Sequence, residues 1–201
     1  MKDSRKRGRE GMMPAEDIVR SKLTGNTLNG GRAHLASLFA ELGYTKGAEI
    51  GVQTGKYSII LCKTIPNLKL ICVDPWGIPR IDRRSEERYQ HCVETLSPYG
   101  TTFIRMTSIE ASKLVPDGSL DFVYIDALHD FDNAMIDITL WAPKVRAGGI
   151  VSGHDYISFQ DYGVIQAVDA YTQIHKIDYY VTQPDLANKI FYISSWFWLK
   201  K

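Results

Sequence analysis

Two apolar runs of this 201-residue chain end in acid–base side chains. Asp126 follows "LDFVYI", His129 comes three residues later, and "GGIVSG" ends in His154 and Asp155. If the two runs are neighbouring strands, about 5 Å apart, their tips bring Asp126 and Asp155 together. Two carboxylates that close repel each other unless a cation or a proton lies between them. The pattern therefore predicts a divalent-metal site or an acid–base cluster, or else two carboxylates that only cap the following segments.

His129 is the candidate general base, because an imidazole with an unperturbed pKa of about 6.5 accepts a proton at neutral pH. The alternative is a structural histidine hydrogen-bonded to Asp130 or to the backbone. The candidate metal ligands are Asp126, His154 and Asp155. A hard ion such as Mg²⁺ suits carboxylate oxygens. An imidazole at His154 favours a softer ion, or it does not ligate at all.

A glycine-rich loop, "AEIGVQTGKYS", forms the second candidate site. Its pattern is ExGxxxG, with Glu49, Gly51 and Gly55, whereas a nicotinamide-binding loop reads GxGxxG. The acid would repel a pyrophosphate but suits a ligand that carries an ammonium or sulfonium group. Asp74 ends the next apolar run about 20 residues later, where an acid reaches a ribose diol. The alternatives are a plain strand-to-helix turn for the glycines and a turn or helix-cap role for Asp74.

Strand and helix patterns alternate five times along the chain, which predicts a largely parallel sheet with helices on both faces. The last two strands follow each other with no room for a helix, so one of them must run antiparallel. In such sheets ligands bind beyond the carboxyl ends of the strands, where both candidate sites lie. The expected strands are 47–52, 68–74, 101–106, 120–126, 148–155, 178–183 and 188–199; the expected helices are 14–23, 30–43, 56–65, 81–96, 108–115, 130–145 and 161–176.

Helical spacing predicts which side chains of three of these helices face the core. The predicted inward faces of the helices are Leu35, Leu38, Phe39 and Leu42; Phe131, Ala134, Met135, Ile138 and Trp141; and Val164, Val168, Tyr171 and Ile174.

The last strand, "SSWFWL", places Trp196 and Trp198 on one face and Phe197 on the other. It is either a strand buried on both faces or part of a subunit interface, where aromatic residues are enriched.

Three segments together carry a family resemblance: "AEIGVQTG", "CVDPW" and the long stretch from "DGSLDFVYID" to "GGIVSGHDY". Over residues 47–156 the chain resembles the class I S-adenosylmethionine-dependent methyltransferases, most of all the small catechol-type and sugar-type O-methyltransferases. The resemblance implies an α/β, Rossmann-like, doubly wound sheet of seven strands, mostly parallel, with an antiparallel C-terminal strand. The basic N-terminal residues predict a flexible tail at 1–13, and the chain length predicts one domain over 14–201. By analogy with relatives, a helical cap at 14–43 would contribute to acceptor binding beside a core at 44–201.

The resemblance also implies roles for individual residues. S-adenosylmethionine would be bound by Glu49, Gly51, Gly55, Ser58, Asp74, Trp76, Ser108 and Asp126. Asp74 would bind the ribose, and Trp76 and Ser108 would lie on the adenine side. The alternatives are that Trp76 is a core residue and that Ser108 is a helix N-cap without a full capping box. Asp126 and Asp155 would take part in catalysis and hold Mg²⁺ or another divalent cation. His154 as a third ligand and His129 as the catalytic base are predictions from their positions in this sequence and not from the resemblance. Two positions depart from the family pattern. Gln53 stands where the family often has a glycine or an aromatic residue, and Leu128 stands where some sugar-modifying relatives have an acidic base.

Composition narrows the remaining classes of function. The chain has 44% hydrophobic residues, a net charge of +1 and three cysteines without a CxxC pair. No apolar run approaches the roughly 20 residues that span a bilayer, and the charge gives no case for nucleic acid. We therefore expect a cytoplasmic protein without a membrane or nucleic-acid partner. The Asp/His cluster and the resemblance favour a small-molecule or sugar acceptor, and the protein would act alone or as a homo-oligomer. Two alternatives stay open: a nicotinamide-dependent oxidoreductase and a non-catalytic binding protein of the same fold.

Overall fold

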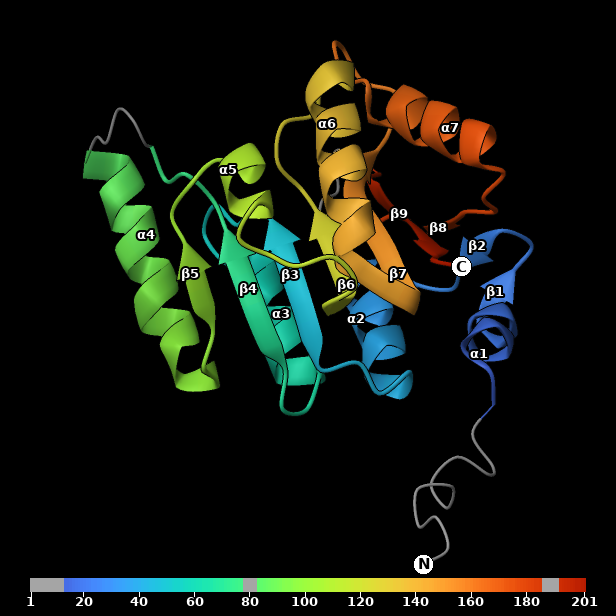
Figure 1. The fold of residues 1–201 in the computed structure, drawn as a ribbon, viewed down its shortest axis with the longest axis horizontal. Coiled ribbons are helices and arrows are strands. Elements are labelled where there is room, and N and C mark those ends of the chain that lie inside the picture. The colour runs from blue at the N-terminus through green and yellow to red at the C-terminus, as the bar shows by residue number, and fades with distance from the viewer. Residues whose placement is uncertain (1–12, 78–82, 186–191) are drawn as a thin grey trace, which may run out of the picture.

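The computed structural model describes residues 13–77, 83–185 and 192–201. Residues 1–12, nearly all of the expected basic tail, lie outside the described residues, as do the first two residues of the expected helix 81–96 and the start of the expected last strand. Within the described part, the chain forms one sheet with the strand order β1-β2-β8-β9-β7-β6-β3-β4-β5 (Figure 1). The strands are β1 (Leu23–Thr24), β2 (Thr27–Leu28), β3 (Lys46–Ile50), β4 (Lys69–Val73), β5 (Thr102–Ile104), β6 (Leu120–Ile125), β7 (Val145–Tyr156), β8 (Tyr180–Thr182) and β9 (Ser194–Leu199).

The central strands β7, β6, β3, β4 and β5 are all parallel, as the alternation of strands and helices predicts. β9 runs antiparallel to both β7 and β8, which confirms the predicted terminal hairpin. The predicted number of seven strands is wrong, because the described residues form nine. The two additional strands are a short hairpin, β1–β2, inside the segment 14–43 that was expected to be helical. Each has only two residues, too few to show a strand period in the sequence.

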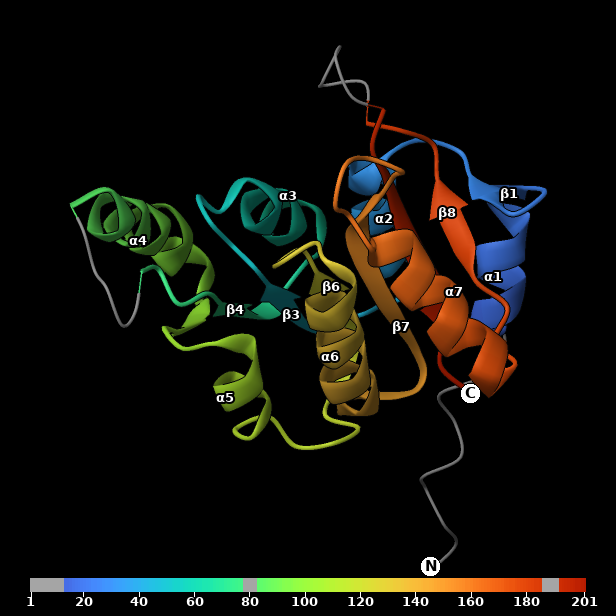
Figure 2. The same ribbon diagram turned by 90° about the horizontal axis from the view of Figure 1, so that it is seen from above.

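Helices cover both faces of the sheet (Figure 2). One core contains side chains from α2, α3 and α4, and a second core contains side chains from α5, α6 and α7. This arrangement confirms the predicted doubly wound architecture. The helices are α1 (Ala15–Ser21), α2 (Arg32–Glu41), α3 (Lys56–Thr64), α4 (Arg83–Leu96), α5 (Ser108–Ser112), α6 (Phe131–Trp141) and α7 (Val164–His175), with short 3₁₀ turns at Ser97–Tyr99 and Ala142–Lys144.

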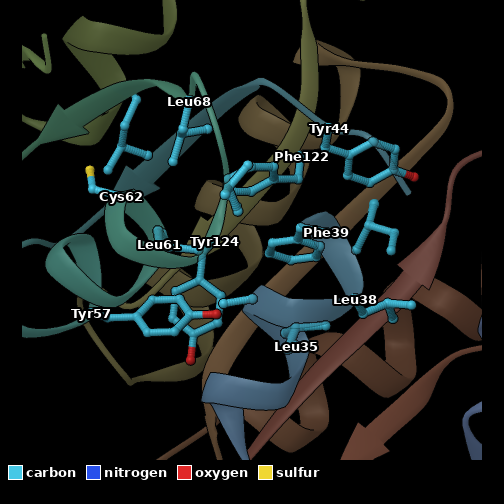
Figure 3. Close-up of a cluster of buried hydrophobic side chains, with 14 of the residues drawn as sticks. Leu35, Leu38, Phe39, Tyr44, Tyr57, Leu61, Cys62, Leu68, Phe122 and Tyr124 are labelled. Carbon is cyan, nitrogen blue, oxygen red and sulfur yellow. The ribbon is translucent and has the colours of Figure 1, made fainter. Parts of the chain in front are cut away.

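Aromatic rings hold α2 and α3 against the sheet (Figure 3). Phe39 of α2 stacks on Phe122 of β6 at 4.3 Å between ring centroids, and Tyr57 of α3 meets Tyr124 at 4.2 Å. The predicted inward face of α2 is confirmed, because all four of its residues are buried. Burying side chains of this size stabilises the fold by about 1.5–3 kcal/mol each. The N-terminal segment is therefore packed on the same core that supports the strands.

The last strand is buried on both faces. Phe197 belongs to the first core, whereas Trp196 and Trp198 belong to the second and stack on each other at 5.2 Å. This confirms the alternation predicted for "SSWFWL". All three cysteines are buried and free. No helix among the described residues is long and apolar enough to cross a membrane.

Two residues of the predicted helix faces do not face the core. Ile174, in the last turn of α7, is 78% exposed, because the helix turns Val164, Ala167, Val168 and Thr172 inward. Phe131 is 43% exposed, because it opens α6 at the rim of the sheet, ahead of the turns that pack. Both errors concern helix ends, where helical periodicity no longer reports which side of the helix is covered.

Candidate functional site

The carboxyl ends of β3, β4, β6 and β7 surround a cleft of about 500 Å³. This volume is in the range that small-molecule and cofactor sites occupy. Most of the predicted site residues line it, and Gly55, Ser58 and Trp76 do not. The walls consist of Glu49, Gly51, Asp74, Ser108, Asp126, His129, His154 and Asp155 from the predicted set, together with Arg32, Ile50, Val52, Gln53, Thr54, Lys56, Tyr57, Val73, Pro75, Ala127 and Leu128.

The ExGxxxG loop needs its first glycine for a close backbone contact. Gly51 has a φ of +88°, and a Cβ added there would lie 2.0 Å from the carbonyl oxygen of Asp126. Gly55 has a left-handed backbone (φ +73°) and is the N-cap of α3. A side chain would be strained at both positions and would not fit at Gly51. The loop is therefore pressed directly against the tip of β6.

Asp74 organises the same loop. Its Oδ2 accepts hydrogen bonds from the backbone N–H of Val52 (3.0 Å) and of Gln53 (2.8 Å), and its Oδ1 accepts one from Trp76 (2.7 Å). The alternative role as a turn residue is thus present in the structure. A carboxylate has about four lone-pair sites, so Asp74 still has acceptor capacity facing the cleft. Its predicted contact with a ribose is compatible with this geometry and stays a prediction.

Glu49 is a buried acid in the wall of the cleft, with only 1% of its surface exposed. The hydroxyl of Ser58 donates a short hydrogen bond to its carboxyl group. Burial raises the pKa of Glu49 to about 8, so it is mostly protonated at neutral pH in the absence of a cationic ligand. Ser58 itself lies behind Glu49 and contacts the cleft only through it.

Trp76 and Ser108 flank the cleft in different ways. Trp76 is 3% exposed, donates from Nε1 to the carbonyl of Gln53 (3.0 Å) and packs against Tyr89. Ser108 lines the cleft, donates to Asp137 and accepts from Trp141 Nε1 (2.9 Å). The N-cap of α5 is not Ser108.

Thr107 caps α5 instead, in a full capping box with Glu110. The reading of Ser108 as a helix N-cap without a capping box is therefore corrected by one residue. A capping box satisfies two backbone N–H groups of the first turn. It leaves the Ser108 hydroxyl free to take part in the chain of hydrogen bonds from Trp141 to Asp137.

The tip of β7 shows why "GHDY" ends a buried strand. β6 and β7 are parallel neighbours that pair Ile125 with Gly153, so Asp126 and Asp155 meet as predicted. A Cβ on Gly153 would lie 2.4 Å from the ring of Trp196. Asp155 has a φ of +55°, a strained backbone that residues other than glycine seldom adopt. Such strain is typical of functional sites.

Four side chains at these tips alternate acid with imidazole. His129 Nε2 lies 3.0 Å from Asp155 Oδ2 and 3.8 Å from Asp126 Oδ1. His154 Nδ1 lies 3.3 Å from Asp155 Oδ2 and 3.9 Å from Asp126 Oδ1. The alternative partner of His129, Asp130, instead caps α6 by accepting from the backbone of Asn133 (3.0 Å). His129 therefore belongs to the cluster.

The cluster holds protons on its imidazoles. The carboxylates of Asp126 and Asp155 raise the pKa of His129 to about 10. Burial disfavours a charged His154, but Asp155 and Asp185 outweigh it and raise its pKa to about 9. Although burial opposes ionisation of Asp155, the two imidazoles hold its pKa well below the ordinary value, whereas burial raises the pKa of Asp126. Without a metal, protons supply the positive charge that the two carboxylates require.

The donor set fits a divalent cation. Asp126, His154 and Asp155 each offer one ligand atom, and these atoms lie within 4.8 Å of one another. Nε2 of His129 and Nε2 of His154 are buried without a well-aligned hydrogen-bond partner, and buried polar groups of this kind call for an explanation. Two carboxylates suit Mg²⁺, and the imidazole extends the choice to softer ions.

Two residues of the cleft region had no signal in the sequence. Arg32 opens α2, and its guanidinium lies 3.9 Å from Asp126 Oδ2 and 5.4 Å from the centre of the Tyr57 ring. Asp185 follows β8 and accepts a 3.0 Å contact from Arg32 Nε. Neither residue belongs to a motif, and only the tertiary fold brings them to the strand tips.

Comparison with known protein families shows which family the chain belongs to. Residues 48–156, more than half of the chain, match the sequence model of a family described as a methyltransferase domain. The chain belongs to this family. The membership confirms the predicted methyltransferase and argues against a nicotinamide-dependent oxidoreductase. A search of curated proteins finds no match.

Solved structures share the methyltransferase fold at low sequence identity. An O-methyltransferase from Bacillus cereus in complex with S-adenosylhomocysteine is 12% identical, with a TM-score of 0.64 over 93% of this chain and 90% of that one. The O-methyltransferase TomG from Streptomyces achromogenes, in complex with S-adenosylmethionine, is 15% identical, with a TM-score of 0.58 over 93% and 88%. At these identities the comparison establishes the fold and leaves substrate and site residues to be argued from the cleft.

Proposed function

We propose that this methyltransferase transfers the methyl group of S-adenosylmethionine to a hydroxyl oxygen of a small-molecule or sugar acceptor. The observation that carries the proposal is the cluster of Asp126, His129, His154 and Asp155, which lies in the wall of the same cleft as the ExGxxxG loop. Acid–base groups beside a cofactor loop are what transfer to a hydroxyl requires. The two O-methyltransferases of similar fold support the choice of oxygen.

The cofactor side of the cleft suits S-adenosylmethionine. Glu49 would face its cationic part, and a nearby cation favours the charged carboxylate over the protonated form. Gly51 lets the backbone approach, and Asp74 would accept hydrogen bonds from the ribose. Ser108 would line the adenine side. Gly55, Ser58 and Trp76 would act from behind the wall, through the turn, Glu49 and Gln53 respectively.

The acceptor side has two tasks, which are orienting the hydroxyl and removing its proton. When bound, the cofactor supplies an electrophilic methyl group on sulfur, and methyl transfer is a direct displacement from sulfur to oxygen. His129 would accept the hydroxyl proton on its imidazole ring, and Asp155, whose Oδ2 lies 3.0 Å from Nε2, would stabilise the resulting imidazolium. This role requires a neutral imidazole, so ligand binding must first lower the pKa of His129 from about 10. Holding acceptor and cofactor in line supplies much of the remaining rate enhancement.

A divalent cation such as Mg²⁺ would be held by Asp126, His154 and Asp155. Its chemistry there would be to compensate the two carboxylates and to lower the pKa of an acceptor hydroxyl. Because the imidazole ligand must be neutral, cation binding would displace a proton from His154. The proposal therefore predicts that chelation lowers turnover, while affinity for the cofactor product changes little.

The test is an acceptor screen with isotopically labelled S-adenosylmethionine, with and without Mg²⁺, read by mass spectrometry of the products. Binding of S-adenosylhomocysteine is measured separately by calorimetry. Labelled methyl ether in the product supports the proposal. Binding without transfer to any acceptor would favour the non-catalytic alternative, and no binding at all would refute the cofactor assignment. Activity that survives exhaustive chelation would remove the metal and leave His129 and Asp155 as a metal-free acid–base pair.

A further inference from the structure

Two segments outside the residues that the family model matches reach the acceptor side of the cleft: Arg32 lines it, and Asp185 contacts Arg32 and His154 from behind. β2 pairs in parallel with β8, placing Thr27 beside Val181 and Leu28 beside Thr182 (Figure 1). Past the paired strands, the N–H of Gln183 donates to the carbonyl of Leu28 (3.0 Å). The chain that leads into α2 and the chain that leaves β8 therefore run together to the strand tips. We call this pair of segments, residues 27–32 and 180–185, the strap.

Asp185 is anchored at the end of the strap by two donors from one residue. Its Oδ1 accepts the backbone N–H of Arg32 (3.0 Å), and its Oδ2 lies 3.0 Å from Arg32 Nε. Gly31, the N-cap of α2, has no side chain to cap the helix. A Cβ on Gly31 would lie 2.1 Å from Asp185 Oδ1, so the glycine makes the room that this carboxylate occupies. Asp185 thus caps α2 from a distant part of the sequence.

The same carboxylate faces the cluster. Asp185 Oδ2 lies 3.7 Å from Nε2 of His154, while Nδ1 on the other edge of the ring is 3.3 Å from Asp155. Nε2 is buried and has no hydrogen-bond partner. At 3.7 Å a small movement of the ring closes a hydrogen bond, and Asp185 is the acidic group in position to form it. The ring of His154 therefore lies between two carboxylates, one at each nitrogen.

We propose that Asp185 is the positioning residue of the site: it holds the Nε2–H edge of His154 and so keeps Nδ1 directed at Asp155 and Asp126. The inference rests on the proposed function, in which His154 belongs to the cluster that prepares the acceptor. A carboxylate that accepts from the far nitrogen of a functional histidine fixes both its orientation and its tautomer. The competing explanation is that Asp185 only caps α2 and pairs with Arg32.

Asp185→Asn separates the two explanations. The amide oxygen of asparagine still caps the N–H of Arg32, but its NH₂ group cannot accept a hydrogen bond from Nε2 of His154. In protein labelled with ¹⁵N-histidine, we expect a solvent-protected ring N–H resonance that His154→Gln removes. Asp185→Asn should remove the same resonance and lower methyl-transfer turnover about 10–100-fold. Affinity for S-adenosylhomocysteine should stay unchanged.

Gly31→Ala provides an independent route to the same state. The added methyl group pushes the carboxylate of Asp185 away while keeping its charge, and the φ of −84° at Gly31 suits alanine. Gln183→Ala is the matched control, because it removes a hydrogen bond from the Gly30 N–H (2.9 Å) on the same strap and leaves Asp185 in place. We expect Gly31→Ala to behave like Asp185→Asn and Gln183→Ala to keep the wild-type resonance and turnover.

The proposal is refuted if wild-type protein has no protected ring N–H from His154, or if either Asp185→Asn or Gly31→Ala retains it. It is also refuted if Asp185→Asn loses no more turnover than Gln183→Ala, in which case Asp185 is a helix cap. Should Asp185→Asn fail to fold, Gly31→Ala decides the question alone. A resonance that depends on Asp185 in a protein that methylates no acceptor would refute the proposed function and leave the positioning role standing.

Discussion

The two halves of the cleft are built in different ways. The half proposed to bind the cofactor comes from the β3–α3 loop and the tip of β4, and it combines backbone N–H groups with a single buried acid. The half proposed to bind the acceptor gathers charged side chains from α2, β6, β7 and the end of β8. We call these the cofactor half and the acceptor half. In the first half, burial neutralises Glu49; in the second, imidazoles compensate the carboxylates. Under the proposed function, cofactor binding would depend on local geometry, whereas acceptor chemistry would depend on how distant segments pack.

The first prediction concerns the point where the two halves touch. Gly51→Ala places a methyl group 2.0 Å from the backbone of Asp126 at a φ of +88°. Gly43→Ala is the matched control, since it has a φ of +69° and nothing within 4 Å. Both variants lose about 1–2 kcal/mol of unfolding free energy from the left-handed backbone. Overpacking should cost Gly51→Ala about 1–3 kcal/mol more, or prevent folding, as urea titration would measure. Equal losses would show that the loop and β6 can separate freely.

The second prediction affects only the acceptor half. His129→Ala removes the candidate base, so turnover on an identified acceptor should fall by about 10²–10⁴. Calorimetry should show unchanged affinity for S-adenosylhomocysteine, because His129 lies on the acceptor side. His91→Ala, an exposed position on α4, should change neither quantity. A His129→Ala protein with full turnover would leave the cluster as a structural feature of the strand ends.

The same contrast explains what the sequence could predict. The parallel order, the terminal hairpin and the meeting of Asp126 with Asp155 follow from strand–helix alternation, because adjacent parallel strands end at one edge. The ExGxxxG loop could be predicted because the residues that determine its conformation lie within one short stretch of the sequence. Arg32 and Asp185 are 153 positions apart and are linked by Arg32 N–H to Asp185 Oδ1, a contact that no periodicity encodes. The β1–β2 hairpin was missed for a related reason, since two-residue strands depend on their neighbours for stability.

A third prediction tests how the raised pKa of Glu49, the acid of the cofactor half, affects the stability of the protein. The pKa of Glu49 in the folded protein is about 8, above its ordinary value of 4.5. The folded state therefore favours the protonated form, and the stability it contributes is complete below pH 4.5 and is lost as the pH rises through about 8. Glu49→Gln stays neutral and should lack this decline, a difference of roughly 5 kcal/mol at most. Urea titrations across this pH range measure it.

A further test of Glu49 repeats these urea titrations in the presence of the cofactor product. A cationic ligand beside Glu49 lowers its pKa, so S-adenosylhomocysteine, through its ammonium group, should reduce the pH dependence of the wild-type protein. Glu49→Gln should show no such change. Parallel curves for the two proteins at every pH would mean that Glu49 ionises without cost and that water reaches it in the cleft.

The smallest expected effect concerns Asp74, which both folds the loop and would bind the ribose. Asp74→Ala should weaken S-adenosylhomocysteine binding by about 1.5–3 kcal/mol, because charge-assisted hydrogen bonds to the ribose are lost. Asp121→Ala is the matched control: its Oδ2 also accepts two backbone N–H groups, from Thr45 (2.8 Å) and Lys46 (2.9 Å), but it does not line the cleft. Asp121→Ala should lower stability and leave cofactor affinity unchanged, as paired calorimetry and urea titration would show. If both variants bind S-adenosylhomocysteine equally well, Asp74 is only a turn residue and the ribose must be held elsewhere.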